Sequence, residues 1–431
     1  MQTAVILAGG KGTRLATVRK DIPKPMIPVL DKPLLQYQIE LLAEHGVTKV
    51  WLIVGHLHEQ IQEYFGDGSR FDIDIQYYIE ESPLGTVGGV KALEAHLNEP
   101  FLVLYGDVMM NMDLEKLVLF HQNKGADATL VVHPNDHPYD SDLLDVDGQD
   151  RVMAFYPKPH PEGLRYRNLV NAAAYVFNPS VLTKLEGGVK ADFGKDIFPW
   201  LYRELKVYAY NTPEYLKDMG TPDRLSKVEQ AISSGKVAQR NLKNPQRCVF
   251  LDRDGVINID TDLIHKAEDF ELYPYAGESI RKINKMGFLA VVVTNQSVLA
   301  RGMCSVADLD EIHKKMETEL GHQGAFVEAI YYCPHHPHGG FPEEVPELKI
   351  DCHCRKPKPG MLLDAAKRFN IDLSNSYLIG DSPRDIEAGQ NAGVTTIRVK
   401  TGHGLKSSEA APDHYVEDLA AAVALIESLE R

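Results

Sequence analysis

The 431-residue sequence has few cysteines, five in all, and no apolar run long enough to span a bilayer. An odd and small number of cysteines cannot supply the disulfide framework that stabilises many secreted domains. The amino-terminal segment MQTAVILAGG also lacks the basic start and the cleavage site of a signal peptide. We therefore expect a cytoplasmic protein that does not act at a membrane.

Basic residues are scarce as well. The chain has 46 Lys and Arg against 61 Asp and Glu, which gives a formal charge of -15. This charge argues against a nucleic-acid partner and against an anionic membrane surface. An anionic substrate must therefore be bound by local groups of basic residues. Whether the protein forms a homo-oligomer is left open.

Strand-like apolar runs such as KVWLIVG and LAVVVTNQS alternate with helical patterns along the chain. This alternation predicts parallel sheets covered by helices, an α/β fold. The length predicts at least two domains. A polar stretch with little apolar period lies near residue 240, so we predict domains over 1–238 and 248–431, joined by a linker over 239–247.

A glycine-rich turn, LAGGKGTRL, follows the first strand-like run. Its glycines, Gly9, Gly10 and Gly12, allow backbone N–H groups to approach a phosphate chain. Lys11 and Arg14 supply positive charge. The spacing matches neither the Walker loop nor G-x-G-x-x-G, and a plain tight turn is the alternative interpretation.

Three charged residues add to this turn. Lys24 lies between two prolines that fix the backbone, as expected for a lysine aimed at a phosphate. Asp107 ends a strand-like run, and Asp218 precedes a glycine turn. Carboxylates at strand ends can hold Mg²⁺ against phosphate oxygens. Each aspartate taken singly is more often a cap or turn residue.

These motifs, in the order G-G-x-G-T-R-L, P-K-P-M, G-D and D-x-G-T, resemble the sugar-phosphate nucleotidyltransferases. With the segment ESPLGTVGG included, the sequence most resembles the heptose-1-phosphate and mannose-1-phosphate guanylyltransferases. The resemblance implies a Rossmann-like, doubly wound domain that joins a nucleoside triphosphate, GTP, to a sugar 1-phosphate. The family pattern differs at two places, since YPKP and NAAAY stand where Glu-Lys and Asn-Ala-Gly are usual.

The resemblance also assigns roles. It implies that Lys24 neutralises the reacting phosphate and that Asp107 and Asp218 hold Mg²⁺. The residues expected to contact the nucleotide phosphates, the base, the sugar or its phosphate are Gly9, Gly10, Lys11, Gly12, Thr13, Arg14, Glu81, Gly85, Thr86, Lys158 and Asn171.

The second half opens with FLDRDGVIN, which places Asp252 and Asp254 two residues apart at the end of an apolar run. Residues two apart in a strand share a face, so we expect both carboxylates on one side. One can serve as a nucleophile that forms an aspartyl phosphate, and the other as acid and then base.

Further polar residues follow later strand-like runs: Thr294 and Asn295, then Arg355 and Lys356, then Asp381 and Asp385. This ordered set resembles the haloacid dehalogenase phosphatases, again with a Rossmann-like, doubly wound fold. The resemblance implies that Asp252 attacks phosphorus and that Thr294, Asn295 and Lys356 hold the phosphoryl group. Asp252, Asp254 and Asp381 are the expected Mg²⁺ site, and Asp385 is expected to stabilise the loop.

A cysteine and histidine cluster lies between these motifs. CPHHPH and CHC provide Cys333, His335, Cys352 and Cys354, a set that suits a closed, structural Zn²⁺ site. His336 and His338 are alternative ligands, and free thiols are the alternative to zinc. A nucleic-acid-binding finger is disfavoured because the C-x-x-C spacing and a basic surface are missing.

The zinc loop narrows the resemblance to the D-glycero-D-manno-heptose 1,7-bisphosphate 7-phosphatases, with histidinol-phosphate phosphatases as the nearest rival. TNQSVLARG has Val298 and Ala300 where that family usually has glycines. Arg355, and as a second candidate Arg301, are expected to reach a second phosphate of the substrate.

The two resemblances imply consecutive reactions of one biosynthetic pathway. Removal of the 7-phosphate from a heptose 1,7-bisphosphate yields the heptose 1-phosphate that the first domain would activate with GTP. Two alternatives remain open at this point. The fusion could act on other sugars and phosphomonoesters, or one domain could sense a nucleotide sugar without turnover.

Overall fold

The computed structural model describes residues 1–10, 21–403 and 410–431, and it contains two compact units. Both units are α/β, which confirms the predicted fold class. The boundaries predicted along the chain stay a prediction, because the second unit also takes in two segments from earlier in the sequence. Unit 1 comprises Met1–His133, Ser141–Pro159 and Leu169–Asn241, and unit 2 comprises Pro134–Asp140, His160–Asn168 and Leu242–Arg431.

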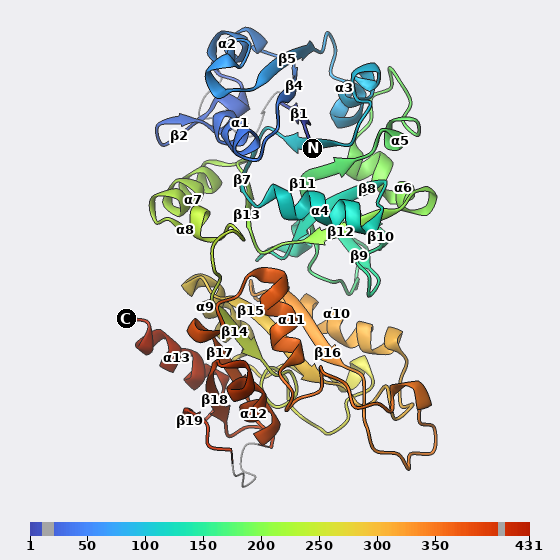
Figure 1. Ribbon diagram of the computed structural model, residues 1–431, viewed down its shortest axis with the longest axis vertical. Helices are drawn as coiled ribbons and strands as arrows, with labels where there is room; N and C mark the ends of the chain where they lie inside the picture. The colour runs from blue at the N-terminus through green and yellow to red at the C-terminus, as the bar shows by residue number, and fades with distance from the viewer. Residues whose placement is uncertain (11–20, 404–409) are drawn as a thin grey trace. The chain divides into compact units, whose positions relative to one another are not determined.

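Unit 1 is built on a nine-stranded mixed sheet (Figure 1). Its strands are β1 (Thr3–Leu7), β4 (Lys49–Val54), β5 (Asp74–Ile79), β6 (Phe101–Tyr105), β8 (Ala128–His133), β9 (Leu143–Val146), β10 (Val152–Tyr156), β11 (Val170–Phe177) and β12 (Val207–Asn211). The main path runs β10-β9-β11-β6-β1-β4-β5, and β8 pairs with β11 and β12. The strands β6, β1, β4 and β5 are mutually parallel, whereas β11 is antiparallel to β6 and β8.

Helices cover both faces of this sheet. In β1, Ala4 and Ile6 belong to one apolar cluster and Val5 to another, as the alternation of side chains along a strand requires. The first cluster includes residues of α1 (Leu34–Glu44), α2 (His58–Phe65) and α4 (Leu114–Lys124), and the second includes residues of α3 (Gly85–Ala92), α5 (Pro179–Leu182) and α6 (Phe198–Glu204). With both faces covered, the sheet can bind a ligand only at its strand ends.

Unit 1 also contains smaller strands and helices, and both units contain short helical turns. The remaining strands of unit 1 are β2 (Pro28–Val29), β3 (Lys32–Pro33), β7 (Val108–Asn111) and β13 (Tyr215–Asp218). Its remaining helices are α7 (Pro222–Ser233) and α8 (Lys236–Gln239). Short helical turns are η1 (Lys24–Met26), η2 (Ser69–Phe71), η3 (Glu94–His96), η4 (Pro138–Asp140), η5 (Phe193–Ile197), η6 (Ala267–Asp269), η7 (Pro346–Leu348) and η8 (Leu373–Asn375).

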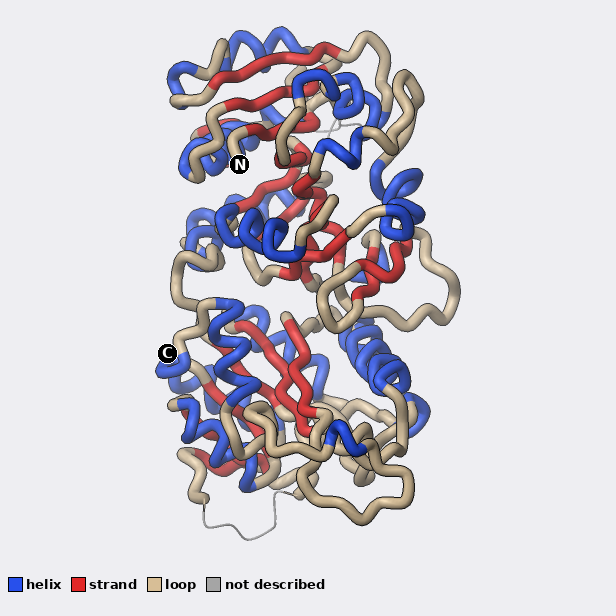
Figure 2. The backbone as a smooth tube through the Cα atoms, turned by 45° about the vertical axis from the view of Figure 1, so that its right-hand side comes forward, coloured by secondary structure: helices blue, strands red, loops and turns tan. Residues whose placement is uncertain are grey.

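Unit 2 has a six-stranded sheet in which every pair is parallel. Figure 2 draws its strands in red and its helices in blue. Its strands, in the order β16-β15-β14-β17-β18-β19, are β16 (Ala329–Cys333), β15 (Leu289–Asn295), β14 (Cys248–Leu251), β17 (Tyr377–Gly380), β18 (Thr395–Val399) and β19 (His414–Val416). A parallel sheet needs a crossover between successive strands, and helices provide most of these crossovers.

The helices of unit 2 also lie in two layers. Val249 and Leu251 pack in one apolar cluster and Cys248 and Phe250 in the other. The first cluster includes residues of α9 (Ala276–Met286), α10 (Val306–His322) and α13 (Leu419–Leu429), and the second includes residues of α11 (Gly360–Phe369) and α12 (Pro383–Ala392). In the described part of the chain, no helix has both the length and the apolar character to cross a bilayer.

Candidate active sites

The central strands of unit 2 bring its charged residues together. Strand β14 ends directly before Asp252, β17 ends directly before Asp381, and Thr294 lies near the end of β15. Because β14 pairs in parallel with both neighbours, these three strand ends meet at one edge of the sheet. The fold therefore brings Asp252, Thr294 and Asp381 together, as the sequence motifs predict.

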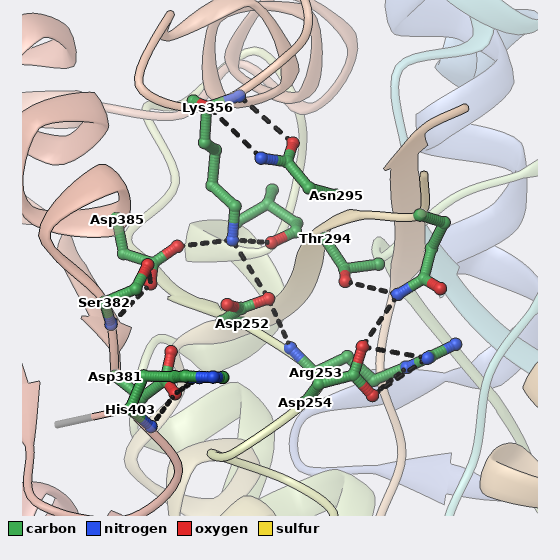
Figure 3. A network of polar contacts seen from close by, with 12 residues as sticks. Asp252, Arg253, Asp254, Thr294, Asn295, Lys356, Asp381, Ser382, Asp385 and His403 are labelled. Atoms are coloured by element: carbon green, nitrogen blue, oxygen red, sulfur yellow. Dashed lines mark hydrogen bonds and ion pairs between the residues drawn. The ribbon is translucent and has the colours of Figure 1, made fainter. Parts of the chain in front are cut away.

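Lys356 is the centre of this edge (Figure 3). Its Nζ atom lies 2.9 Å from Oδ1 of Asp252 and 2.5 Å from Oδ1 of Asp385. It also donates to the backbone carbonyl of Val293 at 2.8 Å. Burial alone would lower the pKa of Lys356, but Asp252 and Asp385 raise it above its ordinary value, so the ammonium stays charged.

Three carboxylates, of Asp252, Asp381 and Asp385, have oxygens within 4.8 Å of one another. Burial, and then the charge of Asp385, raise the pKa of Asp252 well above its ordinary value and that of Asp381 to about 6. A hard divalent cation would relieve this repulsion, so the donor set fits Mg²⁺. Asp385 is the least available of the three, because Ser382 donates to its Oδ2 through both N–H and hydroxyl.

Asp254 is not one of these three carboxylates. Strand β14 ends at Leu251, so the alternation that predicts a shared face does not reach Asp252 and Asp254. The Asp254 carboxylate instead accepts from Nε and Nη2 of the buried Arg253 at 2.8–3.0 Å, and from Nε2 of Gln296 at 2.9 Å (Figure 3). The proposed roles of Asp254 in metal binding and proton transfer stay predictions.

Thr294 and Asn295 have defined partners. The hydroxyl oxygen of Thr294 accepts from Gln296 at 2.8 Å. The side-chain amide of Asn295 bonds the backbone of Lys356 in both directions, each at 3.1 Å, and so fixes the start of the lysine side chain. The sequence interpretation missed Gln296, although it is a polar residue directly after a predicted strand.

The four predicted zinc ligands lie together. The ligand atoms of Cys333, His335, Cys352 and Cys354 are all within 4.8 Å of one another. Neighbouring sulfurs are separated by 3.3 and 3.5 Å, and Nδ1 of His335 lies 3.5 and 3.6 Å from two of them. Such spacing fits ligands around one tetrahedral ion. A hydrogen bond from Cys354 is the main cause that lowers the pKa of Cys333 to about 5, which favours a thiolate.

Two arginines flank the cysteine and histidine cluster. Arg355 donates to the carbonyl of His335 at 2.9 Å, and the guanidinium of Arg301 lies 4.2 Å from the ring centroid of Phe341. Burial, and then the charges of Arg355 and Arg301, lower the pKa of His336, so both guanidinium groups act on one imidazole. Positive charge therefore gathers beside the loop. The alternative ligand His336 contacts His338 and lies outside the cluster.

In unit 1, a cleft of about 520 Å³ opens beside Gly9 and Gly10. Other residues of the predicted set, Lys24, Gly85, Thr86 and Asp107, also line it. Lys11, Gly12, Thr13 and Arg14 lie outside the described residues. Among its other lining residues are two charged ones that the sequence interpretation missed, Glu80 and Lys190.

Lys24 and Asp107 form an ion pair in this cleft, with Nζ and Oδ2 separated by 2.5 Å. Strand β7, which begins directly after Asp107, pairs with β13, which ends at Asp218. The N–H of Met219 donates to the carbonyl of Asp107 at 2.9 Å, which keeps the two chain segments adjacent. Asp218 also forms an ion pair with Arg224. Asp107, directly before β7, and Asp218, at the end of β13, thus lie on adjacent chain segments, and their carboxylate oxygens are of the kind that Mg²⁺ binds.

Glu80 and its neighbour Glu81 differ in environment. Glu81 is exposed, whereas Glu80 is half-buried and faces the cleft. Burial raises the pKa of Glu80, and its Oε1 atom has no hydrogen-bond partner among the described residues. A Cβ atom added at Gly9 would lie 2.9 Å from the other carboxylate oxygen, so that glycine leaves room for the carboxylate.

The residues predicted to bind the sugar end lie around β11. Asn171 is in β11 and donates to the hydroxyl of Tyr175 at 3.1 Å. Lys158 follows β10, and its N–H donates to Asp142 at 3.1 Å. Thr86 donates to Asp192 at 3.1 Å and accepts from the N–H of Phe193 at 2.8 Å.

Comparison with known families follows the same division of the chain. Residues 3–235 match the family described as nucleotidyl transferase, and residues 353–422 match the family described as HAD-hydrolase-like. The carboxy-terminal part is 39% identical over 187 residues to the D-glycero-beta-D-manno-heptose-1,7-bisphosphate 7-phosphatase of Pasteurella multocida, with 43% of this chain and 99% of that protein covered. A crystal structure of the Bordetella (B. bronchiseptica) D,D-heptose 1,7-bisphosphate phosphatase shares 36% identity over 43% of this chain and 99% of its own, with a TM-score of 0.39.

The amino-terminal relatives use different bases. The UTP–glucose-1-phosphate uridylyltransferase of Synechocystis is 34% identical over 259 residues, which cover 56% of this chain and 65% of that protein. The mannose-1-phosphate guanylyltransferase of Mycobacterium tuberculosis is 35% identical over 223 residues, which cover 51% of this chain and 61% of that protein. The chain thus spans less than two thirds of each of these two relatives.

Proposed function

We propose that this chain, which belongs to the nucleotidyl transferase family through residues 3–235 and to the HAD-like hydrolases through its carboxy-terminal half, is a bifunctional enzyme of nucleotide-activated heptose formation. Unit 2 removes the 7-phosphate of D-glycero-D-manno-heptose 1,7-bisphosphate. Unit 1 then transfers GMP from GTP to heptose 1-phosphate and releases pyrophosphate. The observation that carries the proposal is the buried ion pair of Lys356 with Asp252, beside Asp381 at the sheet edge.

The phosphatase reaction needs a nucleophile that is held in place. Oδ of Asp252 attacks phosphorus while the bond from phosphorus to the C7 oxygen breaks, and Asp254 gives the leaving alkoxide its proton. Water then attacks the aspartyl phosphate as Asp254 accepts a proton from it, which releases phosphate and restores Asp252. Lys356 balances the charge of the transferred group throughout.

Metal binding supports both reactions. In unit 2, Asp252 and Asp381 would hold Mg²⁺, which neutralises charge on the phosphoryl oxygens. In unit 1, Asp107 and Asp218 would hold Mg²⁺ against the triphosphate. The cluster of Cys333, His335, Cys352 and Cys354 would hold Zn²⁺ as a structural ion that shapes the loop near Arg355.

The transferase reaction is an in-line attack of a sugar-phosphate oxygen on the α-phosphorus of GTP, with pyrophosphate as the leaving group. The protein aligns two anions and screens their repulsion. Lys24 supplies this charge from its place in the cleft beside Gly9 and Gly10. Lys158 and Asn171 would contact the sugar phosphate, and Arg14, outside the described residues, would add charge to the phosphate turn.

Glu80 supports GTP as the nucleotide. A carboxylate is a pure acceptor with two oxygens. Guanine presents N1–H and the N2 amino group side by side, a pair of donors that uracil lacks. Glu80 lines the cleft, and its buried Oε1 atom has no hydrogen-bond partner among the described residues, so this carboxylate could serve as the acceptor for the pair. A partly desolvated carboxylate acceptor at this place supports GTP over UTP as the nucleotide.

Arg301 and Arg355 support a substrate with two phosphates. Both lie near His336, beside the loop that carries the cysteine cluster. A second phosphate at the far end of the sugar would balance their charges. A phosphomonoester without a second anionic group, or with a cationic one such as histidinol phosphate, would leave these guanidinium groups unpaired.

Two assays test the proposal. Phosphate release is measured with heptose 1,7-bisphosphate and with histidinol phosphate, and pyrophosphate release with heptose 1-phosphate and each of four nucleoside triphosphates. We expect the bisphosphate and GTP to be preferred. Asp252→Asn should abolish only phosphate release. Faster turnover of histidinol phosphate, or equal use of UTP and GTP, would refute the corresponding half.

The variant Glu80→Gln tests the base assignment directly. A glutamine side chain offers one acceptor and one donor, so it cannot satisfy both guanine donors. We expect the preference for GTP over UTP to fall by about 10- to 100-fold, as for loss of a charged hydrogen bond. The matched control is Glu81→Gln, which removes an adjacent but exposed carboxylate. An unchanged preference in Glu80→Gln would show that the base is read elsewhere.

A further inference from the structure

Asp142 directly precedes β9 in unit 1, and one of its carboxylate oxygens accepts no hydrogen bond from the described residues. Its Oδ1 accepts the N–H of Lys158 at 3.1 Å. Its backbone carbonyl accepts the N–H of Asn171 at 2.9 Å. The contacts of the described residues give its Oδ2 no hydrogen-bond donor. Asp142 therefore bonds Lys158 through its side chain and Asn171 through its backbone, and its Oδ2 remains an unused acceptor.

Gly194 leaves room for this carboxylate. A Cβ atom added at Gly194 would lie 2.8 Å from Oδ2 of Asp142 and 3.4 Å from Oδ1 of Asp192. Asp192 is already occupied, because it caps the turn that begins at Phe193 and accepts from the hydroxyl of Thr86 at 3.1 Å. Of the two carboxylates that flank Gly194, only that of Asp142 has an oxygen free for a ligand.

Polar groups connect this place to the nucleotide cleft. Thr86 and Tyr105 line the cleft, and Thr86 donates to Asp192. Asn171 donates to the hydroxyl of Tyr175 at 3.1 Å, and the rings of Tyr105 and Tyr175 lie edge to face at 6.0 Å. Burial raises the pKa of Tyr175, and the charges of Asp192 and Asp142 add to this effect.

We propose that Asp142 determines sugar specificity in unit 1: its free Oδ2 accepts a hydrogen bond from a hydroxyl of the sugar 1-phosphate, while its Oδ1 fixes the backbone of Lys158. This inference rests on the proposed transferase function. A charged acceptor selects for a hydroxyl at one ring position, because a sugar without that hydroxyl leaves the carboxylate desolvated and unpaired. The alternative is that Asp142 only stabilises the turn at Lys158.

The variant Asp142→Asn separates these roles. The asparagine carbonyl can still accept from the N–H of Lys158, but the charged acceptor is lost. We expect the KM for the sugar 1-phosphate to rise about 10- to 100-fold, with the KM for GTP unchanged. The matched control is Asp147→Asn, since Asp147 accepts two backbone N–H groups in the β9–β10 turn and touches no residue of the site.

A series of deoxy sugar 1-phosphates completes the test. The wild-type enzyme should lose about 10-fold or more in kcat/KM with one deoxy analogue, and Asp142→Asn should lose nothing further with that analogue. Thermal unfolding of both variants shows whether they are folded. The inference is overturned if Asp142→Asn keeps the wild-type KM, or if it keeps the wild-type discrimination at every ring position. A wild-type enzyme that releases no pyrophosphate with any sugar phosphate would instead overturn the transferase function itself.

Discussion

Nζ of Lys356 lies 2.9 Å from Oδ1 of Asp252, and both side chains are nearly inaccessible to solvent. A buried carboxylate without a cation is costly, so this contact sets the charge of the nucleophile. The same ammonium also contacts Asp385, which is fully buried. The lysine therefore serves two carboxylates, of which only Asp252 is available to attack phosphorus.

Removal of this ammonium should abolish the phosphatase. Lys356→Met takes away the charge that stabilises the transferred phosphoryl group, and we expect kcat for phosphate release to fall about 100- to 1,000-fold. Pyrophosphate release by unit 1 should not change. The matched control is Lys358→Met, two residues further on, where the ammonium forms an ion pair with the exposed Asp351 at 2.5 Å. Wild-type phosphate release in Lys356→Met would contradict the role of the lysine.

The cysteine and histidine cluster should bind zinc. We expect one zinc ion per chain by metal analysis and a clear loss of zinc in Cys352→Ser, because a tetrahedral site needs all four ligands. Cys304→Ser is the control. Burial raises the pKa of Cys304 to about 11, so that thiol is a poor ligand. Undiminished zinc in Cys352→Ser would rule out this ligand set.

Lys24 should serve the transferase alone. Lys24→Ala removes a cation from the cleft and leaves Asp107 without its ion-pair partner. We expect pyrophosphate release to fall about 100-fold or more, with phosphate release unchanged. Lys32→Ala is a suitable comparison because Lys32 pairs with Glu40 and does not line the cleft. Equal losses in both variants would indicate a general effect on folding instead.

Much of unit 2 could be predicted because parallel strands place their carboxyl ends together. Asp252, Thr294 and Asp381 converge for that reason, without any detail of packing. The zinc ligands could also be predicted from the sequence, because two short segments contain all four of them. These features depend on local pattern and on a general rule of topology.

Other features depend on packing that a sequence does not display. Strand β14 ends at Leu251, and the contacts that Asp254 makes beyond it, with Arg253 and Gln296, arise from packing. Glu80 and not Glu81 lines the cleft, and both residues follow the end of β5 at Ile79, so the alternation of side chains along a strand could not have identified which of them does. The assignment of two early segments to unit 2 likewise follows from tertiary contacts.

The buried His313 should make the free energy of unfolding of unit 2 depend on pH. It is buried in α10, and its Nε2 lies 3.4 Å from Nη1 of Arg253, which can only donate. Burial, and then the charges of Arg253 and Arg167, lower the pKa of His313 well below its ordinary value. Below about pH 6.5 the unfolded chain therefore binds a proton that the folded chain excludes, and the free energy of unfolding falls as pH falls.

The His313→Gln variant isolates this effect. Raised pKa values at Glu317 and Asp381 act in the opposite direction, so the quantity to compare is the pH slope of the unfolding free energy in wild type and variant. We expect wild type to lose up to about 1.4 kcal/mol more per pH unit than His313→Gln between pH 6.5 and 5. His322→Gln, an exposed histidine at the end of the same helix, should keep the wild-type slope. Equal slopes in wild type and His313→Gln, measured by denaturant unfolding of the full chain, would mean that the buried imidazole is protonated as readily as a free one.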